Sequence, residues 1–447
     1  MSFPRYPKYK PSGVEWLGEV PEHWDVWKLA HAFALIASGT TPKTDNREYY
    51  DDGDIPWVNT GDLNDGELED CGKRITARAL ADHSSLKLYP AGSLLIAMYG
   101  ATIGKLAMLR FPATVNQACC VFAGASPIVS KFMFYWFLGL RQQILSLATG
   151  GGQPNVSQDI LRTLRVGCPD QAEQTKIASF LDRETSKIDG LVGEQRRLIE
   201  LLKEKRQAVI SHAVTKGLNP HAPLKPSGIE WLGDVPEHWE VKSLKRLAEN
   251  IKAGPFGSSL TKDMYVSSGY RVYGQEQVIP NDFNVGDYFI TAEKYEELSQ
   301  YRVAPRDILI SCVGTFGKIA IVPDAVAPGI INPRLLRLRC SNAISAEYLA
   351  EVLRSLVTFE QFALLSRGGT MDVINIGTLN AILVAVPPIA EQNGIVGFLD
   401  TETAKFDALT AEADRGIELL QERRTALISA AVTGQIDVRG LVATEAA

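Results

Sequence analysis

The chain carries the stretch KPSGVEWLGEVPEHWDV at residues 10–26 and repeats it as KPSGIEWLGDVPEHWEV at residues 225–241, with three conservative differences. A second repeat follows each block, because AEQTKIASFLD at residues 172–182 returns as AEQNGIVGFLD at residues 390–400. The chain therefore contains two copies of one unit, each made of a block, a variable region and a helix. Two copies predict a pseudo-two-fold molecule, because solenoids and propellers need several short repeats to close a core.

Length and composition are those of a soluble globular protein. The 447 residues are 45% hydrophobic and 22% charged, which suits about two to four domains. The longest apolar run, residues 132–140, is too short for a membrane span, and the N-terminus lacks the apolar segment of a signal peptide. We therefore expect a cytoplasmic protein with no membrane partner. The six cysteines include no CxxC pair and no histidine at ligand spacing, so we expect neither disulfides nor a metal site.

A long helix is predicted after each variable region. Asp170 and Glu173 form a capping-box pattern at the first helix start. Apolar positions then recur at steps of three and four, which is typical of a coiled coil, over about 40 residues or roughly 60 Å. The expected seam of the first helix is Ile177, Leu181, Glu184, Ile188, Leu191, Gln195, Leu198, Leu202, Lys205 and Val209. The expected seam of the second helix is Ile395, Leu399, Glu402, Phe406, Leu409, Ala413, Gly416, Leu420, Arg423 and Leu427.

The two seams share one register, so we expect the two helices to pack on each other. A pseudo-two-fold axis perpendicular to both helices makes this pair antiparallel. The alternative is that each seam binds a helix of a separate partner.

The variable regions have the pattern of mixed α/β domains. Short β-rich runs at residues 93–99 and 307–313 accompany one helical segment each, at residues 131–146 and 345–366. The predicted fold class is α+β: two mixed α/β domains related by pseudo-two-fold symmetry and separated by two long helices in an antiparallel coiled coil. The expected boundaries are a first domain at 1–168, a helix at 169–215, a linker at 216–224, a second domain at 225–386, a helix at 387–436 and a C-terminal tail at 437–447.

Both β-rich runs lead into a glycine turn that ends in lysine, GATIGK at residues 100–105 and GTFGK at residues 314–318. These turns lack the four-residue gap and the Ser/Thr of a phosphate loop, so we exclude nucleotide binding. Each is either a turn that places Lys105 or Lys318 against a DNA phosphate or a plain hairpin turn.

Charge is unevenly distributed, although the formal net charge is −6. Residues 72–168 contain ten Lys/Arg against two acids, and the acids of the first variable region lie within residues 45–70. The second region carries Arg334, Arg337 and Arg339, of which Arg337 and Arg339 are two residues apart, as on one face of a strand. Any single one of these residues is equally well explained as solvated surface charge, but the regional asymmetry favours a DNA-facing side.

The loops of the two variable regions differ. SGTTPK at residues 38–43 stands where the second copy has AGPFGS at residues 253–258, and GGGQPN at residues 150–155 contrasts with RGGTMD at residues 367–372. Polar side chains match the edges of bases in the major groove, and glycine permits close approach of the backbone. The candidate DNA-binding residues are Thr40, Thr41, Lys43, Lys73, Arg74, Thr102, Lys105, Gln153, Asn155, Phe256, Ser258, Ser259, Lys262, Thr315, Lys318, Arg334, Arg367 and Thr370.

The tandem blocks and the two helix starts together resemble the specificity subunit of type I restriction-modification systems, over essentially the whole chain. The resemblance implies two target-recognition domains that read a bipartite double-stranded DNA sequence. It also implies two methyltransferase subunits, which use S-adenosylmethionine to modify adenine, and restriction subunits, which use ATP and Mg. These cofactors belong to the partners, and none is expected in this chain.

The chain itself is expected to be non-catalytic, because it lacks a methyltransferase Asn/Asp-Pro-Pro-aromatic motif and a Walker A motif. His23 and His238 each precede a tryptophan, and we interpret both pairs as anchors of the block rather than as catalytic groups. The alternative function is a coiled-coil scaffold whose two domains bind polypeptides. A modification-only or defence system with a different effector also stays open.

Overall fold

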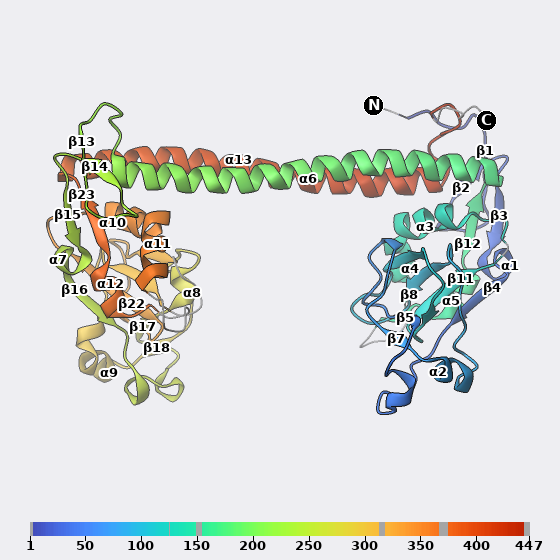
Figure 1. The fold of residues 1–447 in the computed structure, drawn as a ribbon, viewed down its shortest axis with the longest axis horizontal. Coiled ribbons are helices and arrows are strands. Elements are labelled where there is room, and N and C mark those ends of the chain that lie inside the picture. The colour runs from blue at the N-terminus through green and yellow to red at the C-terminus, as the bar shows by residue number, and fades with distance from the viewer. Residues whose placement is uncertain (1–2, 125, 149–153, 313–317, 366–373, 442–447) are drawn as a thin grey trace. The chain divides into compact units, whose positions relative to one another are not determined.

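The computed structural model describes residues 3–124, 126–148, 154–312, 318–365 and 374–441. The chain forms two compact units (Figure 1). The first unit comprises Met1–Gln195 and Arg415–Ala447, and the second comprises Arg196–Asp414. Among the described residues, no helix is both long and apolar enough to cross a membrane.

Two long helices, α6 (Gln171–Lys216) and α13 (Ile389–Val432), contribute to both units. In the first unit Ile177, near the start of α6, shares a core with Ile428, near the end of α13. In the second unit Ile210, near the end of α6, shares a core with Ile395, near the start of α13. The beginning of each helix thus packs with the end of the other, which confirms the antiparallel pair.

The buried seam of each helix follows only half of the predicted positions. In α6 the predicted Leu191 and Leu198 are 47% and 43% exposed, whereas the adjacent Val192 and Ile199 are each 8% exposed. In α13 the predicted Leu409 is 48% exposed. The repeat is a heptad in both cases, but every second seam position lies one residue later than predicted. After Ile188, for example, the next buried seam residue is Val192, four residues later, whereas the prediction placed it three residues later at Leu191.

The first unit contains five short helices and twelve strands among its described residues. The helices are α1 (Leu29–Ala32), α2 (Ala77–Asp82), α3 (Ser130–Gly139), α4 (Arg141–Ser146) and α5 (Gln158–Thr163). The strands are β1 (Tyr9–Pro11), β2 (Glu19–Pro21), β3 (Asp25–Lys28), β4 (Leu35–Ser38), β5 (Ile55–Val58), β6 (Gly66–Leu68), β7 (Arg74–Ile75), β8 (Leu94–Ala97), β9 (Leu106–Leu109), β10 (Thr114–Val115), β11 (Cys119–Ala123) and β12 (Arg165–Cys168).

The second unit follows a similar order, except that helix α8 stands between β17 and β18 where the first unit has strand β6. Its helices are α7 (Leu244–Leu247), α8 (Gln275–Val278), α9 (Ala292–Glu297), α10 (Ala346–Arg354), α11 (Leu356–Leu365) and α12 (Ile376–Ala381). Its strands are β13 (Leu224–Pro226), β14 (Asp234–Pro236), β15 (Glu240–Ser243), β16 (Ala248–Ala253), β17 (Tyr270–Tyr273), β18 (Phe289–Ile290), β19 (Ile308–Ser311), β20 (Ile319–Ile321), β21 (Gly329–Ile331), β22 (Leu335–Cys340) and β23 (Leu383–Val386).

The sheets of the two units correspond, except that β6 of the first unit has no counterpart among the described strands of the second. The larger sheet has the order β4-β11-β8-β9-β6 in the first unit and β16-β22-β19-β20 in the second. The smaller sheet has the order β10-β5-β7 in the first unit and β21-β17-β18 in the second. Within each unit the small sheet lies on the side away from that unit's segments of the long helices (Figure 1). The mixed α/β prediction is confirmed.

Each variable region begins and ends with two paired strands, which form a two-stranded stem. β3 pairs antiparallel with β12, and β15 pairs antiparallel with β23. The chain therefore enters and leaves each variable region on adjacent strands. The block itself folds as a short hairpin, β1 with β2 and β13 with β14, just before the stem.

Each predicted helical segment of the variable regions is two helices rather than one. The second region shows the cause at Ser355, which has extended backbone angles of φ −73° and ψ 154° between α10 and α11. Its hydroxyl donates to the carbonyl of Val352 at 2.6 Å and accepts from the backbone N–H of Thr358 at 3.4 Å. A buried serine that bonds its own backbone in this way ends one helix and starts the next.

The Glu-Gln pair at the start of each long helix ties the unit together. Nε2 of His23 lies 2.9 Å from Oε2 of Glu173, and Nε2 of His238 lies 2.8 Å from Oε2 of Glu391. The histidines therefore attach the block to the long helix. The tryptophans after them, Trp24 and Trp239, are fully buried.

The glutamine of each pair is buried and holds the loop before α3 or α10. Gln174 accepts from the backbone N–H of Val129 at 2.7 Å, and Gln392 accepts from that of Ser345 at 2.8 Å. Their amide groups donate to two carbonyls each. The repeated motif thus fixes the variable region, as well as the block, on the helix pair.

Candidate nucleic-acid interface

In the first unit, one cluster of polar and aromatic side chains follows the ends of β4, β5 and β10. The indole N–H of Trp57 donates to the carbonyl of Thr40 at 3.3 Å. The ammonium nitrogen of Lys73 lies 5.8 Å from the centre of the Trp57 ring. The hydroxyl of Thr41 donates to Oε1 of Gln117. The structure therefore brings the predicted Thr40, Thr41 and Lys73 together.

A third predicted loop reaches the same cluster. Asn155 pairs with Tyr99 in an isolated antiparallel bridge. The phenol of Tyr99 forms a side-chain hydrogen bond with Gln117, and partial burial raises the pKa of this phenol. Asn155 is thus linked through Tyr99 and Gln117 to Thr41. Gln153 lies outside the described residues.

The other predicted residues of the first unit lie around this cluster or apart from it. Lys43 is exposed two residues after Thr41. Arg74 is ion-paired with Asp70 at 2.9 Å, so its charge is partly neutralised. Thr102 and Lys105 lie in the turn between β8 and β9, where the backbone N–H of Lys105 donates to the carbonyl of Thr102 at 2.9 Å.

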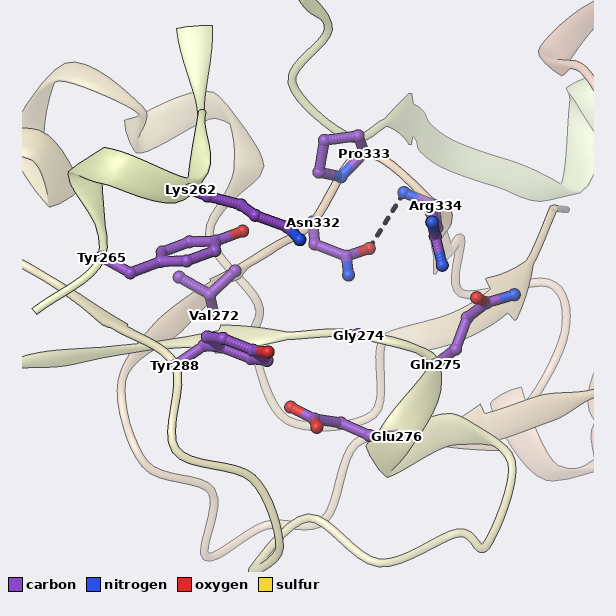
Figure 2. Close-up of a pocket in the computed structure, with 10 residues that line it drawn as sticks. All are labelled: Lys262, Tyr265, Val272, Gly274, Gln275, Glu276, Tyr288, Asn332, Pro333 and Arg334. Atoms are coloured by element: carbon purple, nitrogen blue, oxygen red, sulfur yellow. Dashed lines mark hydrogen bonds between the residues drawn. The ribbon is translucent and has the colours of Figure 1, made fainter. Parts of the chain in front are cut away.

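In the second unit, two of the predicted residues line a cavity and the other described ones lie outside its lining. Phe256 is 68% exposed, and Ser258 and Ser259 belong to the 3₁₀ turn Gly257–Ser259 that follows it. Lys262 and Arg334 line a cavity of about 410 Å³ (Figure 2). Lys318 is exposed at the start of β20. Thr315, Arg367 and Thr370 lie outside the described residues.

The two clusters start from the same place in their units. A Cβ atom on Gly39 would lie 1.6 Å from the carbonyl oxygen of Val115, and one on Gly254 would lie 1.9 Å from that of Asn332. Only glycine permits this contact between the loop and the end of the small sheet. The residues that follow the two glycines are Thr-Thr in the first unit and Pro-Phe in the second. Equivalent positions therefore present different side chains.

Two of these three arginines, Arg337 and Arg339, bond other residues of the unit and do not form an exposed strip for DNA. Arg339 bonds Asp307 through Nε at 2.8 Å, and this bond raises the pKa of its guanidinium. Arg337 is 6% exposed and donates to Oδ1 of Asn250 at 2.8 Å. Asp307 is 1% exposed, so its charge needs these partners. Only Arg334, which precedes β22, is exposed.

Half of the ten basic residues of 72–168 form ion pairs with acids of the same unit. The acids of residues 45–70 pair with them across the fold, which the linear sequence does not show. The pairs are Arg74–Asp70, Arg78–Glu48, Arg110–Glu67, Lys131–Glu67 and Arg141–Asp65. In contrast, Lys73 and Lys105 form no ion pair with any residue that the structure describes. These two unpaired lysines, rather than the regional charge, are therefore the stronger candidates for contact with DNA phosphates.

Several residues of the two clusters were missed from the sequence. Tyr99 and Gln117 organise the first cluster, and Tyr265, Tyr288 and Asn332 line the cavity of the second. Aromatic or amide residues within a few positions of a strand end are the signal that they share. No group of His, Cys, Asp and Glu within the described parts of the chain is arranged to hold a metal ion.

The family model described as "Type I restriction modification DNA specificity domain" matches residues 21–200 and 236–419. These segments cover both units and most of the chain. The chain belongs to this family of type I restriction-modification specificity subunits.

Individual relatives agree with the family assignment. The type I restriction enzyme MjaIX specificity subunit of Methanocaldococcus jannaschii is 26% identical over 258 residues, which cover 56% of this chain and 56% of that subunit. The MjaVIII specificity subunit of the same organism is 24% identical over 437 residues, covering 94% of this chain and 95% of that subunit. A solved chain described as "Structural basis underlying complex assembly and conformational transition of the type I R-M system" has a TM-score of 0.70 at 17% identity, covering 92% of this chain and 98% of that chain. The last likeness shows the fold.

Proposed function

We propose that this chain is the DNA-reading subunit of a type I restriction-modification complex, in which each unit reads one half of a bipartite double-stranded target. One observation carries this proposal. The two units share the stem, the sheets and the glycine contact of the loop, yet the side chains at the equivalent surface differ. A duplicated scaffold with two different polar surfaces suits the reading of two different short sequences.

The described residues also support the assignment of chemistry to partner subunits. His23, His238 and Asp307 are engaged in internal pairs with Glu173, Glu391 and Arg339. We infer that methyltransferase subunits supply S-adenosylmethionine and methylate adenine, and that restriction subunits supply ATP- and Mg-dependent cleavage. This chain is non-catalytic and brings both to the target in the cytoplasm.

We assign the reading surfaces to recognition domains at residues 1–168 and 225–386, with helices at 169–215 and 387–436 as the spacer. Thr40, Thr41, Lys73 and Asn155 form the surface of the first domain, and Phe256, Lys262 and Arg334 form that of the second. The paired stem strands make each variable region a separable insert, because the chain enters and leaves it at one place. An exchange between relatives is therefore expected to preserve folding.

The test is co-expression with the cognate methyltransferase subunits, followed by sequencing of the methylated sites. Residues 27–168 are replaced by the corresponding region of a relative, and residues 242–386 are replaced in a second variant. Each exchange should alter one half of the methylated motif and leave the other half unchanged. Alteration of both halves by one exchange would contradict the modular assignment.

A binding measurement separates this function from a polypeptide-binding scaffold. Affinity for duplex DNA should fall steeply as salt rises from about 50 to 200 mM, because neutralised phosphates release counterions. A chain that binds no DNA with its methyltransferase partners present would favour the scaffold.

A further inference from the structure

Asn116 and Asn332 occupy equivalent places in the two units. Each follows the edge strand of the small sheet and donates its backbone N–H to the end of the central strand, at 3.0 Å and 2.8 Å respectively. Each side-chain oxygen accepts from the backbone N–H two residues later, at 3.1 Å for Asn116 and 2.9 Å for Asn332. The amide planes are therefore fixed in the same way, and both hydrogens of each amide nitrogen are left to bond elsewhere.

The two amide nitrogens meet different neighbours. In the first unit Nδ2 of Asn116 donates to Oδ1 of Asn59 at 3.3 Å. The residue at the matching position of the second unit is Gly274, which also follows the central strand directly. A Cβ atom on Gly274 would lie 2.5 Å from Nδ2 of Asn332. Glycine thus leaves this donor open, and Nδ2 of Asn332 has no hydrogen-bond partner among the described residues.

The open donor lies in the wall of the 410 Å³ cavity (Figure 2). One side of the cavity carries the rings of Tyr265 and Tyr288, whose centroids are 4.9 Å apart at an interplanar angle of 43°. The other side carries Arg334, which is exposed and forms no ion pair with a described residue. Glu276 lies at the base of the view (Figure 2).

This combination suits a nucleobase better than a phosphate. The tyrosine rings provide apolar contacts for the edge of a base, and the carboxylate of Glu276 offsets one of the two cations, Lys262 and Arg334, that line the cavity. Asn332 presents a donor because its oxygen is already occupied, and Arg334 presents further donors. Two neighbouring donors match the O6 and N7 acceptors on the major-groove edge of guanine, while adenine needs a donor and an acceptor together.

We propose that this cavity reads one guanine of the half-site bound by the second unit, through Arg334 and Asn332. Gly274 makes the reading possible by leaving the Asn332 amide free. In the first unit the corresponding amide of Asn116 donates to Asn59 instead. This inference rests on the proposed function, and it adds the base and the residues that read it.

The test uses the full chain with its methyltransferase subunits and compares methylated motifs. The parent motif should contain a G·C pair in the half-site that the exchange of residues 242–386 alters. Arg334→Ala, a change at an exposed position, should reduce discrimination at that one pair by roughly 10- to 100-fold, as expected for one bidentate contact. Gly274→Asn should also reduce discrimination at this base pair, because the new side chain can accept from the Asn332 amide as Asn59 accepts from Asn116 in the first unit. Arg246→Ala, another exposed arginine of the second unit, serves as the matched control and should change neither half-site.

The outcomes separate this inference from the function on which it rests. If the parent methylates a bipartite motif and Arg334→Ala methylates the same motif with the same selectivity, the guanine pocket is wrong and the function stands. A change confined to the other half-site would also overturn the pocket. If the parent directs no bipartite methylation, the proposed function has failed.

Discussion

Arg424 of α13 forms an ion pair with Asp189 of α6 in the first unit, with 2.9 Å between Nε and Oδ1. The second unit contains the exchanged pair, Arg206 of α6 with Asp407 of α13, at 3.5 Å. Both aspartates and both arginines are related by 218 residues (407 − 189 and 424 − 206). Two copies of one helix packed antiparallel produce this exchange, because the arginine of each copy meets the aspartate of the other.

The Arg424–Asp189 ion pair should favour the antiparallel register of α6 and α13 while adding little to the free energy of unfolding. Asp189 is 56% exposed and Arg424 is 28% exposed, so water screens their attraction. In a double-mutant cycle with Arg424→Ala and Asp189→Ala, urea unfolding should give a coupling of roughly 0.2–1 kcal/mol. A coupling of several kcal/mol would mean that the pair is desolvated. The pair Lys203–Glu200, which lies within one helix, is the control for local effects.

The corrected seam predicts opposite results at two adjacent residues. Ile199→Asp places a carboxylate at a position that is 8% exposed, and should destabilise the second unit by several kcal/mol. Leu198→Asp, at a position that is 43% exposed, should change the unfolding free energy by about 0.5 kcal/mol or less. Urea titration of the full chain compares them. A larger loss for Leu198→Asp than for Ile199→Asp would favour the seam predicted from the sequence.

Gln392 should be needed to hold the second variable region. Its side chain is fully buried, accepts from the N–H of Ser345 at 2.8 Å and donates to the carbonyls of Ala343 and Pro387 at 3.1 and 2.9 Å. Gln392→Leu leaves these backbone groups without partners, at about 1–3 kcal/mol for each buried group. Hydrogen exchange should rise in α10 and stay unchanged in α3 of the first unit. Asn393→Ala, at an exposed neighbour, is the control, and unchanged exchange in α10 would contradict the assigned role.

The sequence predicted the architecture because its repeats mark the parts that bind each other. The block, the Glu-Gln pair and the apolar helix faces recur since each makes the same contact twice. Seam register was only half predictable, because Leu191 and Val192, or Leu198 and Ile199, are both apolar and both fit a step of three or four. The choice between neighbours depends on the partner helix, which a single helix pattern does not contain.

The candidate sites were less predictable, for two physical reasons. Charges distant in sequence neutralise each other, as in Arg141–Asp65, so a basic stretch is not a basic surface. The state of an amide depends on its spatial neighbour, and Asn332 is open only because Gly274 stands beside it. Strand pairing has to be known before that neighbour can be named.

Lys105 should act as a phosphate contact. Lys105→Ala should weaken binding to all duplex sequences alike and reduce the slope of log affinity against log salt by about one. Arg110→Ala is the matched control, since Arg110 is already paired with Glu67 at 3.4 Å and should give the smaller effect. Gel shifts at graded salt provide both slopes. A change in base preference with an unchanged slope would assign Lys105 to base reading instead.

The long helices should set the spacing between the half-sites. Seven residues inserted after Leu191 and seven after Leu409 preserve the heptad and lengthen each helix by roughly 10 Å. At about 3.4 Å per base pair this corresponds to nearly three base pairs. The methylated motif should then either gain a spacer about three pairs longer or be lost, because added DNA twist also rotates one half-site against the other.

Both half-sites must keep their sequences in the insertion variant, because no loop of either cluster has been altered. A control with two residues inserted after each leucine moves the following apolar positions off the seam and should destabilise the helix pair. Sequencing of the sites methylated by the heptad variant measures both the spacer length and the half-site sequences. An unchanged spacer combined with altered half-sites would show that the helices do not measure the distance between the two halves of the target.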